Sequence, residues 1–301
     1  MRVWILLTLS LVCASARADP VRVFVGVPPL QTFVQGVGGR LVEAHSLVQP
    51  GQSPHVYEPT PRQVASLGSA DLYVGIGIPF EAGQLPRIRA ANPGLRVLDA
   101  RQGIDLRRLE AHDHGHAQDG SAEDRVHRGD AGAARAELAD MDPHVWTSPP
   151  LGKHIARAIR DALVEIDPAN AAEYRANYER LAARLDRLDR EIRARLDPLS
   201  RRRFMVYHPA WGYFADTYGL VQIPIEKAGK EPGPRSLAAL VDQARREGVK
   251  VIFVQPQVAS KAAEQVAAAI GGRVVVIDPL AADYEASLRR AAREIAEAAG
   301  Q

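Results

Sequence analysis

Cysteine is almost missing from this chain of 301 residues. The single cysteine, Cys13, lies in an N-terminal segment that we expect to be removed. A mature chain without cysteine forms no disulfide and no thiolate metal site. The chain also has no large excess of either charge. It contains 38 Lys and Arg side chains and 36 Asp and Glu side chains, and loss of Arg2 and Arg17 makes the two numbers equal. This balance excludes a broad basic surface for nucleic acid and gives no indication of a polybasic membrane patch.

Long apolar runs are absent after the N-terminal segment. Residues 1–18 begin with one arginine, continue with the apolar run Val3–Ala14 and end with the small-x-small pattern Ala16–Ala18. This order is typical of a cleaved signal peptide, and the run is shorter than the roughly 20 apolar residues that cross a bilayer. We therefore predict an exported protein. Lipidation of Cys13 remains an alternative, although Val12 stands where a small residue is expected.

Hydrophobic residues make up 46% of the whole sequence, and after the N-terminal segment short apolar runs alternate with helical patterns. Runs rich in branched side chains and separated by helices indicate parallel strands that are buried on both faces. We predict an α/β fold of two lobes, residues 19–170 and 198–301, each a parallel sheet flanked by helices. The expected strands are Val21–Val27, Leu41–Val48, Asp71–Ile76, Leu95–Leu98, Arg203–Tyr207, Leu220–Ile225, Val249–Val254 and Arg273–Ile277.

One long amphipathic helix is predicted between the lobes, over Ala171–Leu196, with Asp197 and Pro198 ending it. Its apolar side chains recur at steps of three and four. At 1.5 Å per residue it would span about 39 Å, the length of a whole domain. We expect residues 171–197 to form a rigid connector, and a coiled-coil dimer through the same apolar stripe is the alternative. The apolar stripe consists of Tyr174, Tyr178, Leu181, Leu185, Leu188, Ile192 and Leu196.

Residues 110–137 interrupt the pattern with a polar segment rich in glycine and alanine. The segment has no apolar period, so we expect a flexible surface loop. His112, His114 and His116 form a His-x-His-x-His tract in this segment. Such a tract is a candidate auxiliary site for weak metal binding, and a solvated linker with incidental histidines is the alternative.

Outside the loop, five histidines remain. His45 falls inside an expected strand, which favours a packed core position, and His154 falls on the polar face of a helix. The other three differ, because His55 and His144 lie in proline-containing turns and His208 directly follows a strand.

One carboxylate has a similar place, since Asp278 directly follows the strand Arg273–Ile277. Parallel sheets bind ligands outside the carboxyl ends of their strands, so these four side chains could meet between the lobes. Neutral imidazoles and one carboxylate suit zinc, and four protein ligands indicate a site that holds the ion rather than uses it. For any single histidine, an ordinary hydrogen-bonded role is the alternative, because the four residues lie far apart and share no local ligand motif.

The residues around these positions carry a specific resemblance. The segments PGQSPHVYEPTP, MDPHVWTSP, YHPAWGYFADTYGL and VIDPLAADY occur in that order along the chain. They strongly resemble the metal-binding solute-binding proteins of ABC transporters for zinc and manganese, over essentially the whole mature chain. The resemblance implies two α/β lobes joined by one rigid helix with a metal ion between them, and His55, His144, His208 and Asp278 as its ligands.

The resemblance also implies a function, and we expect a periplasmic protein that captures Zn²⁺ and delivers it to the permease of an inner-membrane ABC importer. We expect a monomer that binds no nucleic acid and is not an enzyme. A manganese or iron carrier of the same family is the main alternative, and His208 in place of an oxygen ligand favours zinc. A zinc-dependent hydrolase and a surface adhesin or metal buffer are further alternatives.

Overall fold

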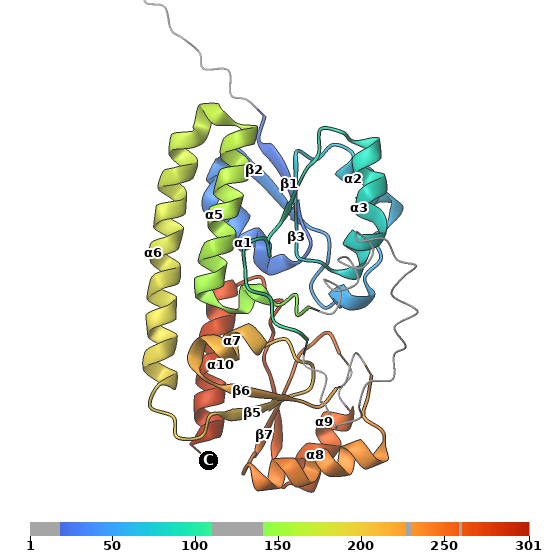
Figure 1. Ribbon diagram of the computed structural model, residues 1–301, viewed down its shortest axis with the longest axis vertical. Coiled ribbons are helices and arrows are strands. Elements are labelled where there is room, and N and C mark those ends of the chain that lie inside the picture. Colours follow the sequence, from blue (N-terminus) through green and yellow to red (C-terminus); the bar gives the residue numbers. More distant parts are fainter. Residues whose placement is uncertain (1–18, 110–140, 227–229, 259–260, 301) are drawn as a thin grey trace, which may run out of the picture.

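The computed structural model describes residues 19–109, 141–226, 230–258 and 261–300, which form two α/β lobes. The first lobe occupies the upper half of Figure 1 and the second the lower half. Each contains a four-stranded sheet, and all six strand pairings are parallel. The strand orders, β2-β1-β3-β4 and β6-β5-β7-β8, repeat one topology, so the lobes are two versions of the same unit. The two-lobed α/β class predicted from the sequence is confirmed.

The eight expected strands all form; seven are slightly shorter than their apolar runs, and the fourth, expected over Leu95–Leu98, is shifted by one residue to Arg96–Asp99. The first sheet contains β1 (Val21–Val25), β2 (Val42–Ser46), β3 (Leu72–Gly75) and β4 (Arg96–Asp99). The second sheet contains β5 (Arg203–Val206), β6 (Val221–Pro224), β7 (Val251–Val254) and β8 (Arg273–Val276). Because the strands of each sheet run parallel, their carboxyl ends share one edge, and these edges carry the histidines described below.

Two of the flanking helices, α2 and α5, start where a capping residue precedes proline. Thr60 and Gln63 form a complete capping box, and Ser148 caps the next long helix by accepting a hydrogen bond from the Leu151 amide. The helices are α1 (Pro28–Gly38), α2 (Pro61–Leu67), α3 (Pro79–Ala91), α5 (Pro149–Ile166), α6 (Ala171–Leu196), α7 (Gly212–Tyr218), α8 (Pro234–Arg246), α9 (Lys261–Ala269) and α10 (Tyr284–Ala299). Among the described residues, no helix combines the length and the apolar character that a membrane span needs.

The long helix α6 runs along one side of both lobes (Figure 1). It packs against α1 and α5 of the first lobe and against α10 of the second. All seven residues of the predicted apolar stripe are buried. The predicted helix is therefore confirmed, and its stripe is covered by helices of its own chain rather than left for a coiled-coil partner.

The expectation that His45 packs in the core was wrong. His45 is 47% exposed and lies 3.1 Å from a carboxylate oxygen of Glu43. The reason is the strand order, because β2 lies at the edge of the sheet and leaves part of its surface to solvent.

The contact between α1 and α6 leads to a prediction about two helical glycines. A methyl group on Gly36 would lie 2.9 Å from a methyl carbon of the buried Leu181, whereas a methyl group on Gly83 would meet nothing within 4 Å. Alanine favours a helix over glycine by about 0.5–1 kcal/mol. We expect Gly83→Ala to raise the free energy of unfolding by about that amount, and Gly36→Ala to lower it by about 1–3 kcal/mol through overpacking. Urea unfolding of both variants measures the difference, and an equal gain in both would contradict the close α1–α6 packing.

Candidate metal centre

Three histidines from different parts of the chain meet between the two sheets. His55 lies in a short 3₁₀ turn, η2 (Pro54–Val56), which follows the end of β2. His144 comes directly before a second such turn, η4 (Val145–Thr147). His208 comes from the other lobe, directly after β5 and its neighbour Tyr207. Both lobes therefore contribute to one cluster.

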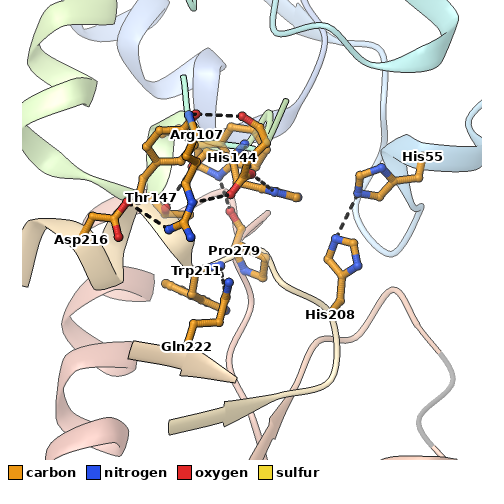
Figure 2. A network of polar contacts seen from close by, with 12 residues as sticks. His55, Arg107, His144, Thr147, His208, Trp211, Asp216, Gln222 and Pro279 are labelled. Atoms are coloured by element: carbon orange, nitrogen blue, oxygen red, sulfur yellow. Dashed lines mark hydrogen bonds and ion pairs between the residues drawn. The ribbon is translucent and has the colours of Figure 1, made fainter. Parts of the chain in front are cut away.

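The three side chains form a group whose candidate ligand atoms all lie within 4.8 Å of one another. The Nε2 atoms of His55 and His208 are 3.1 Å apart and face each other in Figure 2. The centroid of the His144 ring lies 5.5 Å from that of His55 and 5.3 Å from that of His208. In a tetrahedral zinc site with bonds of about 2.0–2.1 Å, two ligand nitrogens are about 3.3 Å apart. The 3.1 Å between His55 and His208 is close to this spacing, and the donor atoms of all three histidines lie within 4.8 Å of one another.

Two buried carboxylates hold the rings that lie deepest. His144 Nδ1 is 2.6 Å from Asp142 Oδ1, and His208 Nδ1 is 2.7 Å from Glu226 Oε1. Each carboxylate accepts a hydrogen bond from Nδ1–H. The lone pair of each ring is therefore on Nε2. The two histidines, one from each lobe, are oriented with their Nε2 atoms available to a cation.

The pKa values of two of the histidines fit the same role. Burial, together with the like charges of the neighbouring His144 and His208, lowers the pKa of His55 from its usual 6.5 to about 3. Burial also lowers the pKa of His144, although Asp142 opposes this shift. Metal binding requires neutral imidazole, and both rings are neutral at physiological pH without any metal.

Asp278, the expected fourth ligand, is not part of the three-histidine group. Its Oδ1 accepts hydrogen bonds from the Gln257 side chain at 2.8 Å and from the Leu280 amide at 2.9 Å. The next residue, Pro279, accepts a hydrogen bond at 2.7 Å from the indole of Trp146, two residues after His144. The turn that contains Asp278 is therefore tied to the turn that contains His144, while the carboxylate itself has protein partners.

Asp142 and Glu226 are site residues that the sequence reasoning missed. Asp142 stands two residues before His144, a spacing that lets its carboxylate bind both the backbone and the ring of His144. Glu226 follows β6, the neighbour of β5, so strand pairing carries it to the same edge as His208. The expected auxiliary tract, His112, His114 and His116, lies outside the described residues.

Two α/β lobes joined by a long helix, with a histidine cluster between them, define the class of two-lobed solute-binding proteins. Residues 23–298 match the family described as ZnuA, zinc-uptake complex component A, periplasmic. The chain belongs to this family.

Known proteins with similar sequences and structures agree with this assignment. The high-affinity zinc uptake system protein ZnuA of Bacillus subtilis is 30% identical over 270 residues, which cover 89% of this chain and 81% of that protein. A crystal structure of ZnuA matches with a TM-score of 0.81 and 38% identity, covering 93% of this chain and all of the other. A deletion mutant of ZnuA with zinc bound matches with the same score and identity, and 98% of it is covered.

The low pKa of His55 leads to a prediction for the metal-free protein. The unfolded chain binds a proton at His55 below about pH 6.5, whereas the folded chain does so only near pH 3. The stability that neutral His55 contributes is therefore complete above pH 6.5 and is lost as the pH falls toward 3. We expect the pH dependence of the unfolding free energy between pH 7 and 4 to be shallower in His55→Ala, by about one bound proton.

His55→Ala must be compared with wild type, because Glu81 makes stability depend on pH in the opposite direction. Burial raises the pKa of Glu81 to about 7, so its contribution is lost as the pH rises through 7. Urea unfolding in a chelator at several pH values gives the slope for each protein. His45→Ala, at the exposed sheet edge, is the control, and a slope in His55→Ala equal to that of wild type would contradict the assignment.

Proposed function

We propose that this protein is exported, captures one Zn²⁺ ion between its two lobes and delivers it to an ABC importer in the inner membrane. The observation that carries the proposal is the cluster of His55, His144 and His208, with donor atoms within 4.8 Å of one another and contributed by both lobes. An ion held there would join the lobes. Delivery then corresponds to a separation of the lobes that removes some of its ligands.

The donor set favours zinc over manganese or iron. Three imidazole nitrogens suit zinc, whereas sites for manganese are richer in carboxylate and other oxygen ligands. Zinc-bound ZnuA, to which this chain is similar over 93% of its length, supports the same choice. The ion is the cargo here, so it must be bound tightly and still be released.

The bonding of the two neighbouring carboxylates argues against a hydrolase that uses the same histidines. A catalytic zinc needs a water molecule and a general base beside it. The carboxylates next to the cluster, Asp142 and Glu226, each accept a hydrogen bond from a ring Nδ1–H and so act as orienting groups. We therefore propose that the protein performs no chemistry on its cargo.

We keep Asp278 as the proposed fourth ligand. It follows β8 at the carboxyl edge of the sheet that also positions His208, and Trp146 ties its turn to the turn of His144. Coordination would require the carboxylate to turn toward the three histidines. One ligand carboxylate against a dication would leave the ion and its four ligands with a net charge of about +1.

The remaining assignments are proposals of the same kind. Residues 1–18 act as a cleaved signal peptide, and the mature protein is a periplasmic monomer whose partner is the importer's permease. Its lobes are residues 19–170 and 198–301, joined by the helix at 171–197. The histidines at 112, 114 and 116 add weak metal sites on the 110–137 segment.

Zinc titration of single variants tests the proposed ligands. We expect wild type to bind one equivalent tightly, and His55→Ala, His144→Ala and His208→Ala each to weaken binding more than about a hundredfold. The basis is that loss of a partner outside the coordination sphere already costs 10–100-fold, so loss of a ligand costs more. Asp278→Ala should weaken binding at least about tenfold. Competition with a chelator of known affinity measures each dissociation constant.

Two controls separate the tight site from other metal binding. His45→Ala removes an exposed histidine outside the cluster and should bind zinc as wild type does. Deletion of residues 112–127 should remove only weak later equivalents, because their sequence has no apolar period and ordering a backbone around a metal costs about 1–2 kcal/mol per residue. Wild-type affinity in any of the three histidine variants would remove that residue from the site, and loss of the tight equivalent in the deletion variant would place a ligand in that segment.

A further inference from the structure

The two lobes are bonded together directly beside His144. Residues 105–109 and 141–144, here called the ribbon, lie side by side through the bridge between Arg108 and Met141 and the hydrogen bond from the Asp142 amide to the Arg107 carbonyl, 2.9 Å long. The ribbon ends at His144. Helix α7 of the second lobe packs against this region and starts four residues after His208. The segments that carry His144 and His208 therefore meet away from the rings as well.

The hydroxyl group of Tyr213, on α7, is hydrogen-bonded to both segments of the ribbon. It accepts a hydrogen bond from the Arg107 amide at 3.2 Å and donates one to the Asp142 carbonyl at 3.0 Å. Tyr213 is 4% exposed, so water does not compete easily for these bonds.

The Arg107 side chain makes a second connection over the same helix. Its Nη1 lies 3.1 Å from Asp216 Oδ2 on α7, and its Nε lies 3.7 Å from Asp142 Oδ2 on the ribbon. Figure 2 shows the guanidinium of Arg107 directed toward Asp216. It also faces the Tyr213 ring, with 5.9 Å between its central carbon and the ring centroid. A side chain at Gly212 would overlap the guanidinium, so the first residue of α7 leaves room for it.

We propose that Arg107 and Tyr213 are positioning residues for the metal centre, which set the separation between His144 and His208. Arg107 and Tyr213 hold Asp142, Asp142 orients the His144 ring, and α7 is continuous with the segment of His208. The distance between the two ligands is then fixed locally, by contacts across the lobes, in addition to the distant support of α6. This inference rests on the proposed zinc site.

A positioning role and a purely electrostatic role predict opposite results. If Arg107 acted only through its positive charge, its removal would strengthen the binding of a dication. If Arg107 positions Asp142, its removal weakens binding. Tyr213→Phe separates the two roles further, because it removes one hydroxyl group and leaves every charge in place.

The test is zinc affinity in the full mature chain, by competition with a chelator, for Tyr213→Phe, Arg107→Gln and Arg107→Lys. We expect Tyr213→Phe and Arg107→Gln to weaken zinc binding about tenfold or more, as loss of an outer-shell partner does, and Arg107→Lys to be weakened less. The visible absorption of the Co²⁺-loaded protein reports the ligand geometry, and its bands should shift in the same variants.

Arg160 and Tyr178 provide matched controls. They form another stacked pair, with 4.6 Å between the guanidinium carbon and the ring centroid, on α5 and α6 outside the metal centre. Arg160→Gln and Tyr178→Phe should bind zinc within twofold of wild type. A weakening in these controls equal to that in the test variants would mean a general loss of packing and would overturn the proposal.

Double variants test whether Arg107 acts through Asp142. Arg107→Gln combined with Asp142→Asn should weaken binding little beyond Asp142→Asn alone, whereas the losses from Arg107→Gln and Glu226→Gln should multiply. Multiplying losses in both pairs would contradict the route through Asp142.

The outcomes separate this proposal from the proposed function. Wild-type affinity in His208→Ala would overturn the metal site itself. Lost binding in His208→Ala, together with affinity within twofold of wild type in both Tyr213→Phe and Arg107→Gln, would overturn only the positioning role. Tighter binding in Arg107→Gln with unchanged binding in Tyr213→Phe would overturn it in favour of a charge effect.

Discussion

The hydrogen bonds from ring Nδ1 atoms to buried carboxylates determine what this molecule can bind. Asp142 in the first lobe and Glu226 in the second accept from His144 and His208 at 2.6 and 2.7 Å. Each bond fixes the tautomer and the direction of its ring, so both Nε2 lone pairs lie in the space between the lobes. The remaining histidine, His55, completes the group from a short turn. Without these two bonds, neither the tautomer nor the direction of the two rings would be set by a carboxylate, and the affinity for a cation would fall.

The repeated topology explains why the ligands meet. Both sheets have the same strand order, and the carboxyl edges of both carry ligand-bearing turns. The helix α6, covered by α1 and α5 in one lobe and by α10 in the other, limits how far the lobes can move apart. The contacts of Arg107 and Tyr213 act closer to the metal centre. Capture and release of a cation then depend on small displacements between lobes held by one stiff helix, which fits a carrier that gives up its cargo.

The fold could be predicted from sequence because local patterns carry it, and the three histidines could be singled out because the segments around them resemble those of metal-binding solute-binding proteins. Apolar runs and cap residues locate the strands and helices, and the period of the α6 stripe defines a buried face. Glu226, Arg107 and Tyr213 could not be found in the same way, because their roles depend on which strands pair and which helix covers the ribbon, and no local pattern encodes either. Asp142 was missed although it stands only two residues before His144, a spacing that lets its carboxylate bind the backbone and the ring. His45 was misplaced for the same reason, because a strand pattern does not tell an edge strand from a central one. Asp278 remains a prediction, since its present bonds are to Gln257 and Leu280.

The central claim is that one ion is held by imidazole nitrogens from both lobes. Zinc X-ray absorption spectroscopy of the protein loaded with one equivalent measures the ligands directly. The account predicts three imidazole nitrogens at about 2.0–2.1 Å and an oxygen donor as the fourth ligand. A spectrum with fewer than three imidazoles per zinc would contradict it.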